Sequence, residues 1–274
     1  MNGRLWLRKY ESRKGKWPMR RLTESLGPVR DRVFGYMQEN VVFVHLPKCA
    51  GTSVRAAIER YYPKTRVTKL SSAGSKHCAD YLGMNMLAYR RGLLIYQLQR
   101  GGKCRFLTGH HPVSSEVLDR WGGKWRFVTL LRDPVDRFIS QYFYNLDSDS
   151  PWVVNHSLEE HVQRERATGG GTMYLHYLGD FFREEMNDPE EAVTEACRTL
   201  DRMDIVGTLE DLPRFVNAFE TKFGKQLRVG VENRNEARQS IRRDQVTPGL
   251  LRQVEDLCRH ERTVYEHVKE LSET

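Results

Sequence analysis

A short loop with small and hydroxyl-bearing residues follows the most apolar run in the first half of the chain. The run is Val41-Val42-Phe43-Val44-His45-Leu46, and the loop is Pro47-Lys48-Cys49-Ala50-Gly51-Thr52-Ser53. Backbone N–H groups of such a loop, and of a helix that starts after it, can converge on an anion. Lys48 adds a point charge, and Thr52 and Ser53 add hydroxyl donors. The loop therefore predicts a phosphate-binding site, and the alternative is a plain strand-to-helix turn.

A second apolar run, Phe127 to Leu131, ends at Arg132-Asp133-Pro134. Arg132 offers a planar fork that suits phosphate. Asp133 is a candidate helix cap and Pro134 a candidate first helical residue. Ser140 follows Arg132 by eight residues, which is about two helical turns, so both can serve one face. The pattern indicates a second anion contact; a surface arginine and an idle helix serine are the alternatives.

A histidine pair, His110-His111, follows the apolar run 105–108 and Gly109. The ordinary pKa of histidine, about 6.5, leaves much of the imidazole neutral near pH 7, which suits a general base. The pair lies between the two phosphate motifs in the sequence, and its residue type suits a base. Without those motifs, two surface histidines in a turn would be the simpler interpretation.

The apolar runs alternate with segments of helical periodicity, which predicts an α/β fold with a central parallel sheet flanked by helices in three layers. Predicted strands cover 41–46, 105–108, 127–131 and 204–207; helices are expected after 53, 133, 188, 211 and 246. Residues 144–185 are expected to be an irregular, mobile segment facing the substrate. Residues 31–274 are predicted to form one domain, preceded by a basic tail or arm at 1–30.

The loop differs from a Walker A motif, in which Lys and Ser/Thr stand at the end of the glycine-rich loop. In this chain Lys48 stands three residues before Gly51, and no Asp is placed convincingly for Mg²⁺. A P-loop kinase or NTPase is therefore disfavoured, and it remains the enzyme alternative.

The segment from His45 to Ser53 resembles the 5′-phosphosulfate loop of sulfotransferases. The nearest pattern is the carbohydrate type, which includes the heparan sulfate 2-O- and 6-O-sulfotransferases and bacterial relatives. The resemblance implies a P-loop-like fold and the donor PAPS (3′-phosphoadenylyl sulfate), which leaves as 3′,5′-bisphosphoadenosine (PAP). It implies that the donor is held by Lys48, Cys49, Ala50, Gly51, Thr52 and Ser53 at its 5′-phosphosulfate, and by Arg132 and Ser140 at its 3′-phosphate.

The resemblance also implies roles in the reaction. Related enzymes carry a Gly-His at the position of Gly109-His110, with the histidine as base, which favours His110 as the catalytic base. His111 departs from the family, where an aromatic or aliphatic residue is usual. Lys48 would stabilise charge on the oxygen between sulfur and the 5′-phosphate. No metal is implied, and the acceptor is expected to be a hydroxyl of a carbohydrate or small metabolite.

Weaker resemblances concern three segments. Residues 206–210 are similar to a segment near the adenine, and Asn233-Arg234-Asn235 to a motif before the last helix. His176 stands where a family segment usually carries Arg. Arg137 is expected to pair with Asp133 or Asp136, or to point at the donor.

Charge and cysteine content limit the setting. The chain has 44 Lys and Arg against 36 Asp and Glu, and residues 1–30 alone hold nine against two. The tail could contact a membrane surface, and a polyanion-binding module that uses the tail is the non-enzyme alternative; a nucleic-acid partner is not expected.

Five cysteines without CxxC spacing favour a reducing, cytoplasmic setting. His77 beside Cys78 is interpreted as an ordinary pair, and no apolar run reaches the ~18 residues of a membrane span.

Overall fold

The computed structural model of the chain describes residues 35–146, 152–230 and 246–273. Contacts divide the chain into residues 1–38 and 39–274, and the strands and helices named below all belong to the second unit. Two segments singled out in the sequence lie outside the described residues: the basic stretch 1–30 and the motif at 233–235.

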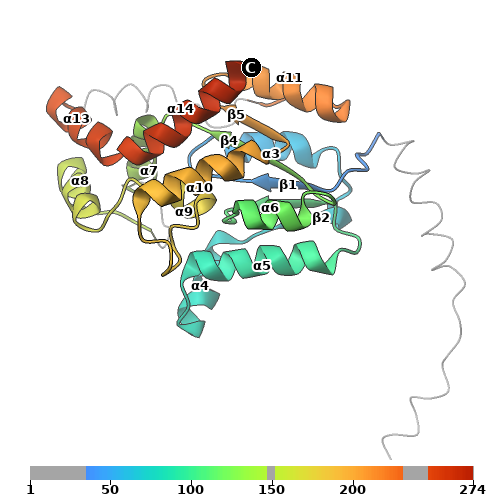
Figure 1. The fold of residues 1–274 in the computed structure, drawn as a ribbon, viewed down its shortest axis with the longest axis horizontal. Helices are drawn as coiled ribbons and strands as arrows, with labels where there is room; N and C mark the ends of the chain where they lie inside the picture. Colours follow the sequence, from blue (N-terminus) through green and yellow to red (C-terminus); the bar gives the residue numbers. More distant parts are fainter. Residues whose placement is uncertain (1–34, 147–151, 231–245, 274) are drawn as a thin grey trace, which may run out of the picture. The chain divides into compact units, whose positions relative to one another are not determined.

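The described part of the chain contains a five-stranded sheet with the order β2-β3-β1-β4-β5, in which all neighbours are parallel (Figure 1). The strands are β1 (Val41–Val44), β2 (Val67–Lys69), β3 (Phe106–Gly109), β4 (Arg126–Leu131) and β5 (Ile205–Thr208). Strand β1 lies at the centre, as its uninterrupted apolar run predicts for a strand covered on both faces. The predicted parallel sheet is confirmed. The short, half-exposed edge strand β2 was not predicted, because three residues carry no periodicity.

The register of the sheet brings the loops after β1, β3 and β4 to one edge. Val44 is paired with Gly109 on one side and with Thr129 on the other. Strands β2 and β3 lie on one side of β1, and β4 and β5 lie on the other, so β1 is the point at which the strand order reverses. In open parallel sheets, ligands bind outside the carboxyl ends of the strands at such a point.

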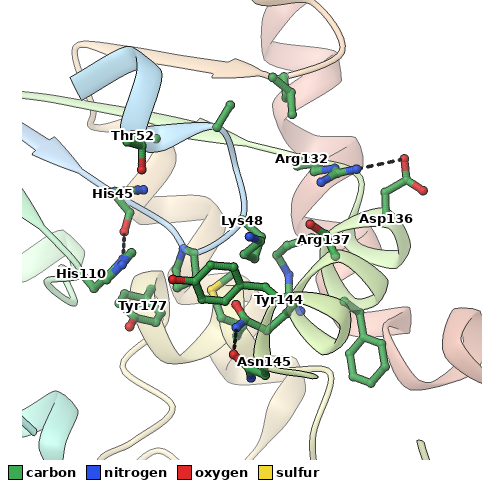
Figure 2. Close-up of a pocket in the computed structure, with 18 of the residues that line it drawn as sticks. His45, Lys48, Thr52, His110, Arg132, Asp136, Arg137, Tyr144, Asn145 and Tyr177 are labelled. Atoms are coloured by element: carbon green, nitrogen blue, oxygen red, sulfur yellow. Dashed lines mark hydrogen bonds and ion pairs between the residues drawn. The ribbon is translucent and has the colours of Figure 1, made fainter. Parts of the chain in front are cut away.

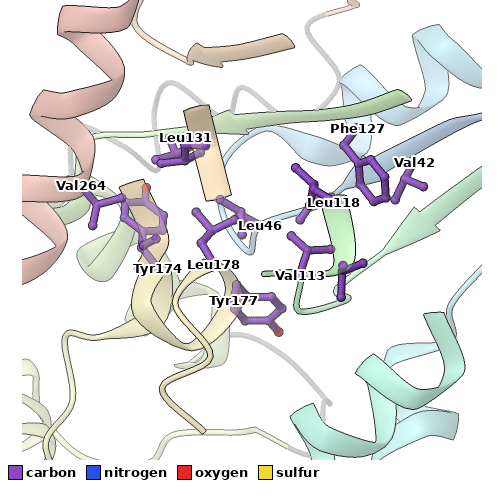
Figure 3. Close-up of a cluster of buried hydrophobic side chains, with 14 of the residues drawn as sticks. Val42, Leu46, Val113, Leu118, Phe127, Leu131, Tyr174, Tyr177, Leu178 and Val264 are labelled. Carbon is purple, nitrogen blue, oxygen red and sulfur yellow. The ribbon is translucent and has the colours of Figure 1, made fainter. Parts of the chain in front are cut away.

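Helices cover both faces of the sheet and complete the three layers. One face packs against α5 (Met86–Arg100), α6 (Ser115–Trp121), α9 (Met173–Leu178), α10 (Pro189–Asp201) and α14 (Arg259–Glu273), in a core that Figure 3 shows in part. Because side chains alternate along a strand, Val42 and Val44 enter this core while Val41 and Phe43 point to the opposite face. There Tyr62, just after α3 (Gly51–Glu59), stacks on Phe106 of β3, and Phe215 of α11 (Leu212–Phe223) packs on Gly207 of β5.

A second apolar cluster joins α7 (Pro134–Leu146), α8 (Leu158–Ala167) and α13 (Pro248–Leu257). The expectation that 144–185 is irregular is wrong, because this segment contains α8 and α9. Only two residues of α8, Leu158 and Val162, are buried, and α9 has six residues, so neither carries a long apolar stripe. The segment predicted to form one last helix forms two helices, α13 and α14, which meet at Cys258.

A buried ion pair ties α7 to α14. Arg137 donates a hydrogen bond to Glu261 (Nη2–Oε2 3.0 Å), and the two residues are 4% and 0% exposed. The other oxygen of Glu261 accepts from the backbone N–H of Tyr174 at 2.7 Å, which adds α9 to the junction. The expectation that Arg137 pairs with Asp133 or Asp136 is therefore wrong, because its guanidinium turns inward, away from the helix surface.

Removing one partner of this pair leaves a charge buried without its counter-ion. We expect Glu261→Leu to lower the free energy of unfolding by about 3–5 kcal/mol. Denaturant unfolding with Arg137→Met, Glu261→Leu and the double variant forms the test. The double variant should be clearly more stable than the sum of the single effects predicts. Strict additivity of the two single effects would show that the pair is not coupled.

Candidate active site

A cavity of about 1000 Å³ opens at the carboxyl edge of the sheet (Figure 2). Both predicted phosphate-binding motifs and the candidate base line it. The sequence-predicted residues in its wall are Lys48, Ala50, Gly51, Thr52, Ser53, His110, Arg132 and Ser140. Cys49 does not line it. Residues about 90 positions apart in the sequence thus meet around one space.

The loop between β1 and α3 has the backbone shape of an anion cradle. Lys48 and Ala50 both adopt positive φ, 63° and 53°, although neither is glycine. Alternating handedness of this kind turns successive backbone N–H groups toward one point. Helix α3 also begins without a side-chain cap, whereas α5 is capped by Asn85. Of the first N–H groups of α3, that of Ser53 donates to the Ala50 carbonyl at 3.1 Å, and no side chain caps those before it.

Gly51 allows this loop to pack against a histidine. A Cβ at Gly51 would lie 1.9 Å from Cδ2 of His45, far inside van der Waals contact. His45 lines the cavity, and burial lowers its pKa to about 3, with the nearby groups His110 and Arg55 acting in the same direction. The requirement for glycine therefore comes from a neighbouring side chain, since Gly51 is not among the residues with positive φ.

The thiol of Cys49 points into the protein instead of the cavity. Its sulfur lies 3.7 Å from the hydroxyl of Tyr174 and 3.5 Å from the carbonyl of Pro47. Burial raises its pKa to about 12, so the thiol stays protonated and is not a nucleophile. Any contact of Cys49 with a ligand would have to come from its backbone.

The second motif has the predicted local structure. Asp133 caps α7 by accepting from the N–H groups of Val135 and Asp136 at 2.9 and 3.1 Å, which confirms the cap. Arg132 forms an ion pair with Asp136 at 3.7 Å, and Ser140 lies two turns along the same helix. A loose, half-exposed pair of this kind can yield to a phosphate.

Lys48 lies between the two motifs. Its ammonium is 3.9 Å from the centroid of the Tyr144 ring, and Figure 2 shows the two side chains together in the middle of the cavity. A cation over an aromatic face is weakly held at a half-exposed ring. The ammonium of Lys48 therefore lies on the side of the cavity that faces α7.

His110 is held in the tautomer that a base requires. Its Nδ1 lies 2.5 Å from the backbone carbonyl of His45, and a carbonyl only accepts, so Nδ1 carries the proton. Nε2 then keeps a free lone pair. Burial lowers the pKa of His110 to about 4, partly opposed by that hydrogen bond, so the ring is neutral near pH 7. Its ring lies 4.5 Å from that of His45 and 6.4 Å from that of Tyr177.

The structure separates the two candidate histidines. His111 is buried, does not line the cavity, and has its Nδ1 3.1 Å from the carbonyl of Arg90. Burial lowers its pKa to about 4 as well. Of this pair, only His110 reaches the cavity.

Several residues of the site have no signal of their own in the sequence. His45, Arg90, Tyr174 and Tyr177 shape or line the cavity, yet each is an unremarkable residue within a strand end or helix. The segment 173–178, noted for His176, does contain two of them, and His176 itself lines the cavity. Leu209 and Glu210, from the segment noted as similar to the adenine side, also line it.

Substitution of Gly51 tests the loop. Gly51→Ala places a methyl group inside the His45 ring, so we expect anion affinity at the loop to fall at least tenfold, measured by calorimetry with adenosine 5′-phosphate. Gly92→Ala is the control, because a Cβ there meets nothing within 4 Å and Gly92 lies inside helix α5. That variant should gain about 0.5–1 kcal/mol of stability and keep its affinity. Equal affinities in both variants would contradict the packing described.

The buried histidines predict acid sensitivity. The folded-state pKa values of His45, His110 and His111 lie below the unfolded value near 6.5, so the unfolded chain binds more protons between pH 6.5 and 4. The stability contributed by each is fully present above pH 6.5 and is lost as pH falls. Denaturant unfolding from pH 7 to 4.5 should show this loss. In the His111→Phe variant this loss of unfolding free energy should be smaller by up to about 3 kcal/mol. If the free energy of unfolding changes with pH in the variant as steeply as in the wild type, the burial of a neutral ring is contradicted.

Comparisons with known proteins add little to this geometry. No protein-family model matches the chain, and no curated protein matches it. Among solved structures, a sulfotransferase from Alicyclobacillus acidocaldarius is similar, with a TM-score of 0.41 and 14% sequence identity over 81% of this chain and 96% of that chain. None of the described helices has the length and apolar character needed to cross a membrane. The residues of the cavity are therefore the basis on which a function can be assigned.

Proposed function

We propose that the protein is a sulfotransferase that moves a sulfuryl group from PAPS to a hydroxyl group. The observation that carries the proposal is the meeting, in one cavity, of two anion-binding motifs and a neutral histidine with a free Nε2. A donor with phosphate groups at both ends of a nucleoside needs two separate anion sites. A hydroxyl acceptor needs a base that is unprotonated near pH 7.

In this proposal the loop and the start of α3 bind the 5′-phosphosulfate through backbone N–H groups. Lys48, Thr52 and Ser53 add side-chain donors, while Cys49, Ala50 and Gly51 contribute only backbone. Arg132 and Ser140 bind the 3′-phosphate. The positive φ values of the loop, the uncapped α3 and the loose Arg132–Asp136 pair fit these roles.

The reaction is a single displacement at sulfur. The acceptor oxygen forms a bond to sulfur while the bond from sulfur to the bridging oxygen of the 5′-phosphate breaks. The electron pair of that bond stays on the bridging oxygen and gives PAP. Nε2 of His110 takes the acceptor proton, and Lys48 stabilises the charge that develops on the bridging oxygen. No oxidation or reduction takes place.

The setting proposed from the sequence is the cytoplasm. The five cysteines, all within the described residues, are unpaired, which fits a reducing compartment. The acceptor proposed from the sequence is a carbohydrate or another small hydroxyl compound.

Binding of PAP without any metal is the first test. At 100 times its dissociation constant, PAP should stabilise the fold by about 2.7 kcal/mol and raise the melting temperature by roughly 5–10 °C. Arg132→Met should weaken PAP binding about 10- to 100-fold, since charged hydrogen bonds are lost. His110→Asn can keep the hydrogen bond to the His45 carbonyl, so it should bind PAP normally and lose about 10²–10⁴ in turnover.

Three outcomes would refute the proposal. The first is no thermal shift at millimolar PAP. The second is binding of ATP only with Mg²⁺, which would favour a P-loop kinase or NTPase. The third is salt-sensitive polyanion binding that survives Gly51→Ala and Arg132→Met, which would favour a binding module. Retained turnover in His110→Asn would leave the donor site standing and move the base elsewhere.

A further inference from the structure

Arg90 of α5 is a buried cation in the wall of the cavity. It is 2% exposed, yet it lines the cavity together with Ser72 of α4 (Ser72–Leu82) and Tyr177 of α9. Its guanidinium donates three hydrogen bonds: Nε to the Ser75 hydroxyl at 2.9 Å, Nη1 to the Tyr177 hydroxyl at 3.3 Å, and Nη2 to the Ser72 carbonyl at 3.0 Å. All three acceptors are neutral.

The other arginines of this region have carboxylate partners. Within the cavity wall, Arg137 pairs with Glu261 and Arg132 with Asp136. The next residue along α5, Arg91, pairs with both Asp180 and Glu116, at 2.6 and 3.1 Å.

For Arg90 no carboxylate lies within ion-pair distance among residues 35–146, 152–230 and 246–273. A charge buried without a counter-ion costs free energy, so such groups are rare unless a ligand completes them. The guanidinium has five N–H groups, and three are used by the described partners, which leaves two. Two N–H groups match the two oxygens of a carboxylate or sulfate group.

Arg90 lies on the base side of the cavity. Tyr177, which accepts from Arg90, has its ring 6.4 Å from the ring of His110. The bonds of Arg90 run to α4 and α9, and none of its hydrogen bonds runs to the loop that holds the donor in the proposed function. One turn before Arg90 on the same face of α5, Met86 and Leu87 add apolar wall.

We propose that Arg90 binds an acidic group, a carboxylate or a sulfate, on the acceptor, and thereby selects acceptors that carry such a group next to an apolar body. The inference rests on the proposed function, since it takes His110 as the point at which the accepting hydroxyl arrives. Arg90 is then a specificity residue, and the apolar part of the acceptor lies against Met86 and Leu87.

A matched pair of probes tests the charge. The probes are 6-hydroxy-2-naphthoate and its neutral isostere 6-hydroxy-2-naphthamide, titrated by fluorescence or calorimetry into the protein with PAP present. The wild-type protein should bind the carboxylate at least tenfold more tightly than the amide. In Arg90→Gln this ratio should fall to near one, while the amide affinity changes little. Arg100→Gln, at the exposed end of the same helix, makes the same charge change outside the cavity and should keep the ratio.

The outcomes separate this inference from the proposed function. Suppose that PAP raises the melting temperature of the wild-type protein while the protein shows no preference for the carboxylate, or binds neither probe. That result overturns the role of Arg90 alone. A preference for the carboxylate probe that survives in Arg90→Gln also overturns the role of Arg90. If Arg90→Gln weakens PAPS relative to PAP and leaves the probe ratio unchanged, the cation serves the sulfuryl group of the donor and the assignment to the acceptor is wrong. Absence of a PAP shift refutes the proposed function, whatever the probes do.

Should Arg90→Gln fail to fold, Arg90→Lys is the second variant. It keeps the charge and loses the two-pronged donor geometry, so the carboxylate preference should fall severalfold but stay above one. A ratio unchanged from wild type would show that the planar fork does not hold the acid group. The wild-type ratio itself needs no variant, and a value of one or less overturns the inference.

Discussion

The hydroxyl of Tyr174 holds both anion-binding segments of the cavity. It accepts from the backbone N–H of Arg132 at 3.0 Å and donates to the carbonyl of the same residue at 2.5 Å. It also lies 3.7 Å from the sulfur of Cys49, in the middle of the first loop. One buried phenol therefore sets the separation of the two segments, in a place where water cannot replace its hydrogen bonds. A ligand with two phosphate groups at a given spacing depends on that separation.

Tyr174 is itself held by the ion pair beneath the cavity. Glu261 accepts from its backbone N–H and pairs with Arg137, whose guanidinium also lies 5.7 Å from the Tyr174 ring centroid. Figure 3 shows Tyr174 among the apolar side chains of the core, with Val264 of α14 beside it. The free energy of burying these charges is offset only while each keeps its partner. Helix α14 is thus part of the structure that positions the cavity wall, although none of its residues from 259 to 271 line the cavity.

Charge is distributed unevenly around the cavity. Cations line it at Lys48, Arg90 and Arg132, whereas burial keeps His45 and His110 neutral. Nearby positive charge adds to the effect of burial on both rings. A neutral base beside fixed cations is suited to removing a proton next to anionic groups, because the cations attract the anions while the base stays unprotonated. An anionic ligand would raise the pKa of His110, and because burial lowers that pKa to about 4, the ring can still be neutral near pH 7 beside such a ligand.

Local patterns in the sequence determined the parts of the cavity that are built from short segments. The apolar run of β1, the loop with Gly51, the Asp133 cap and the histidine pair after β3 could all be predicted, because strand burial, capping and turn chemistry depend on residues a few positions apart. The parallel sheet could be predicted from the alternation of apolar runs with segments of helical periodicity. Only the tertiary structure decided which histidine reaches the cavity, that the Cys49 thiol faces inward, and that Arg137 pairs with Glu261 instead of a helical neighbour. Each of these depends on contacts between residues far apart, up to 125 positions for Cys49 and Tyr174, and no pattern within a helix or strand encodes them.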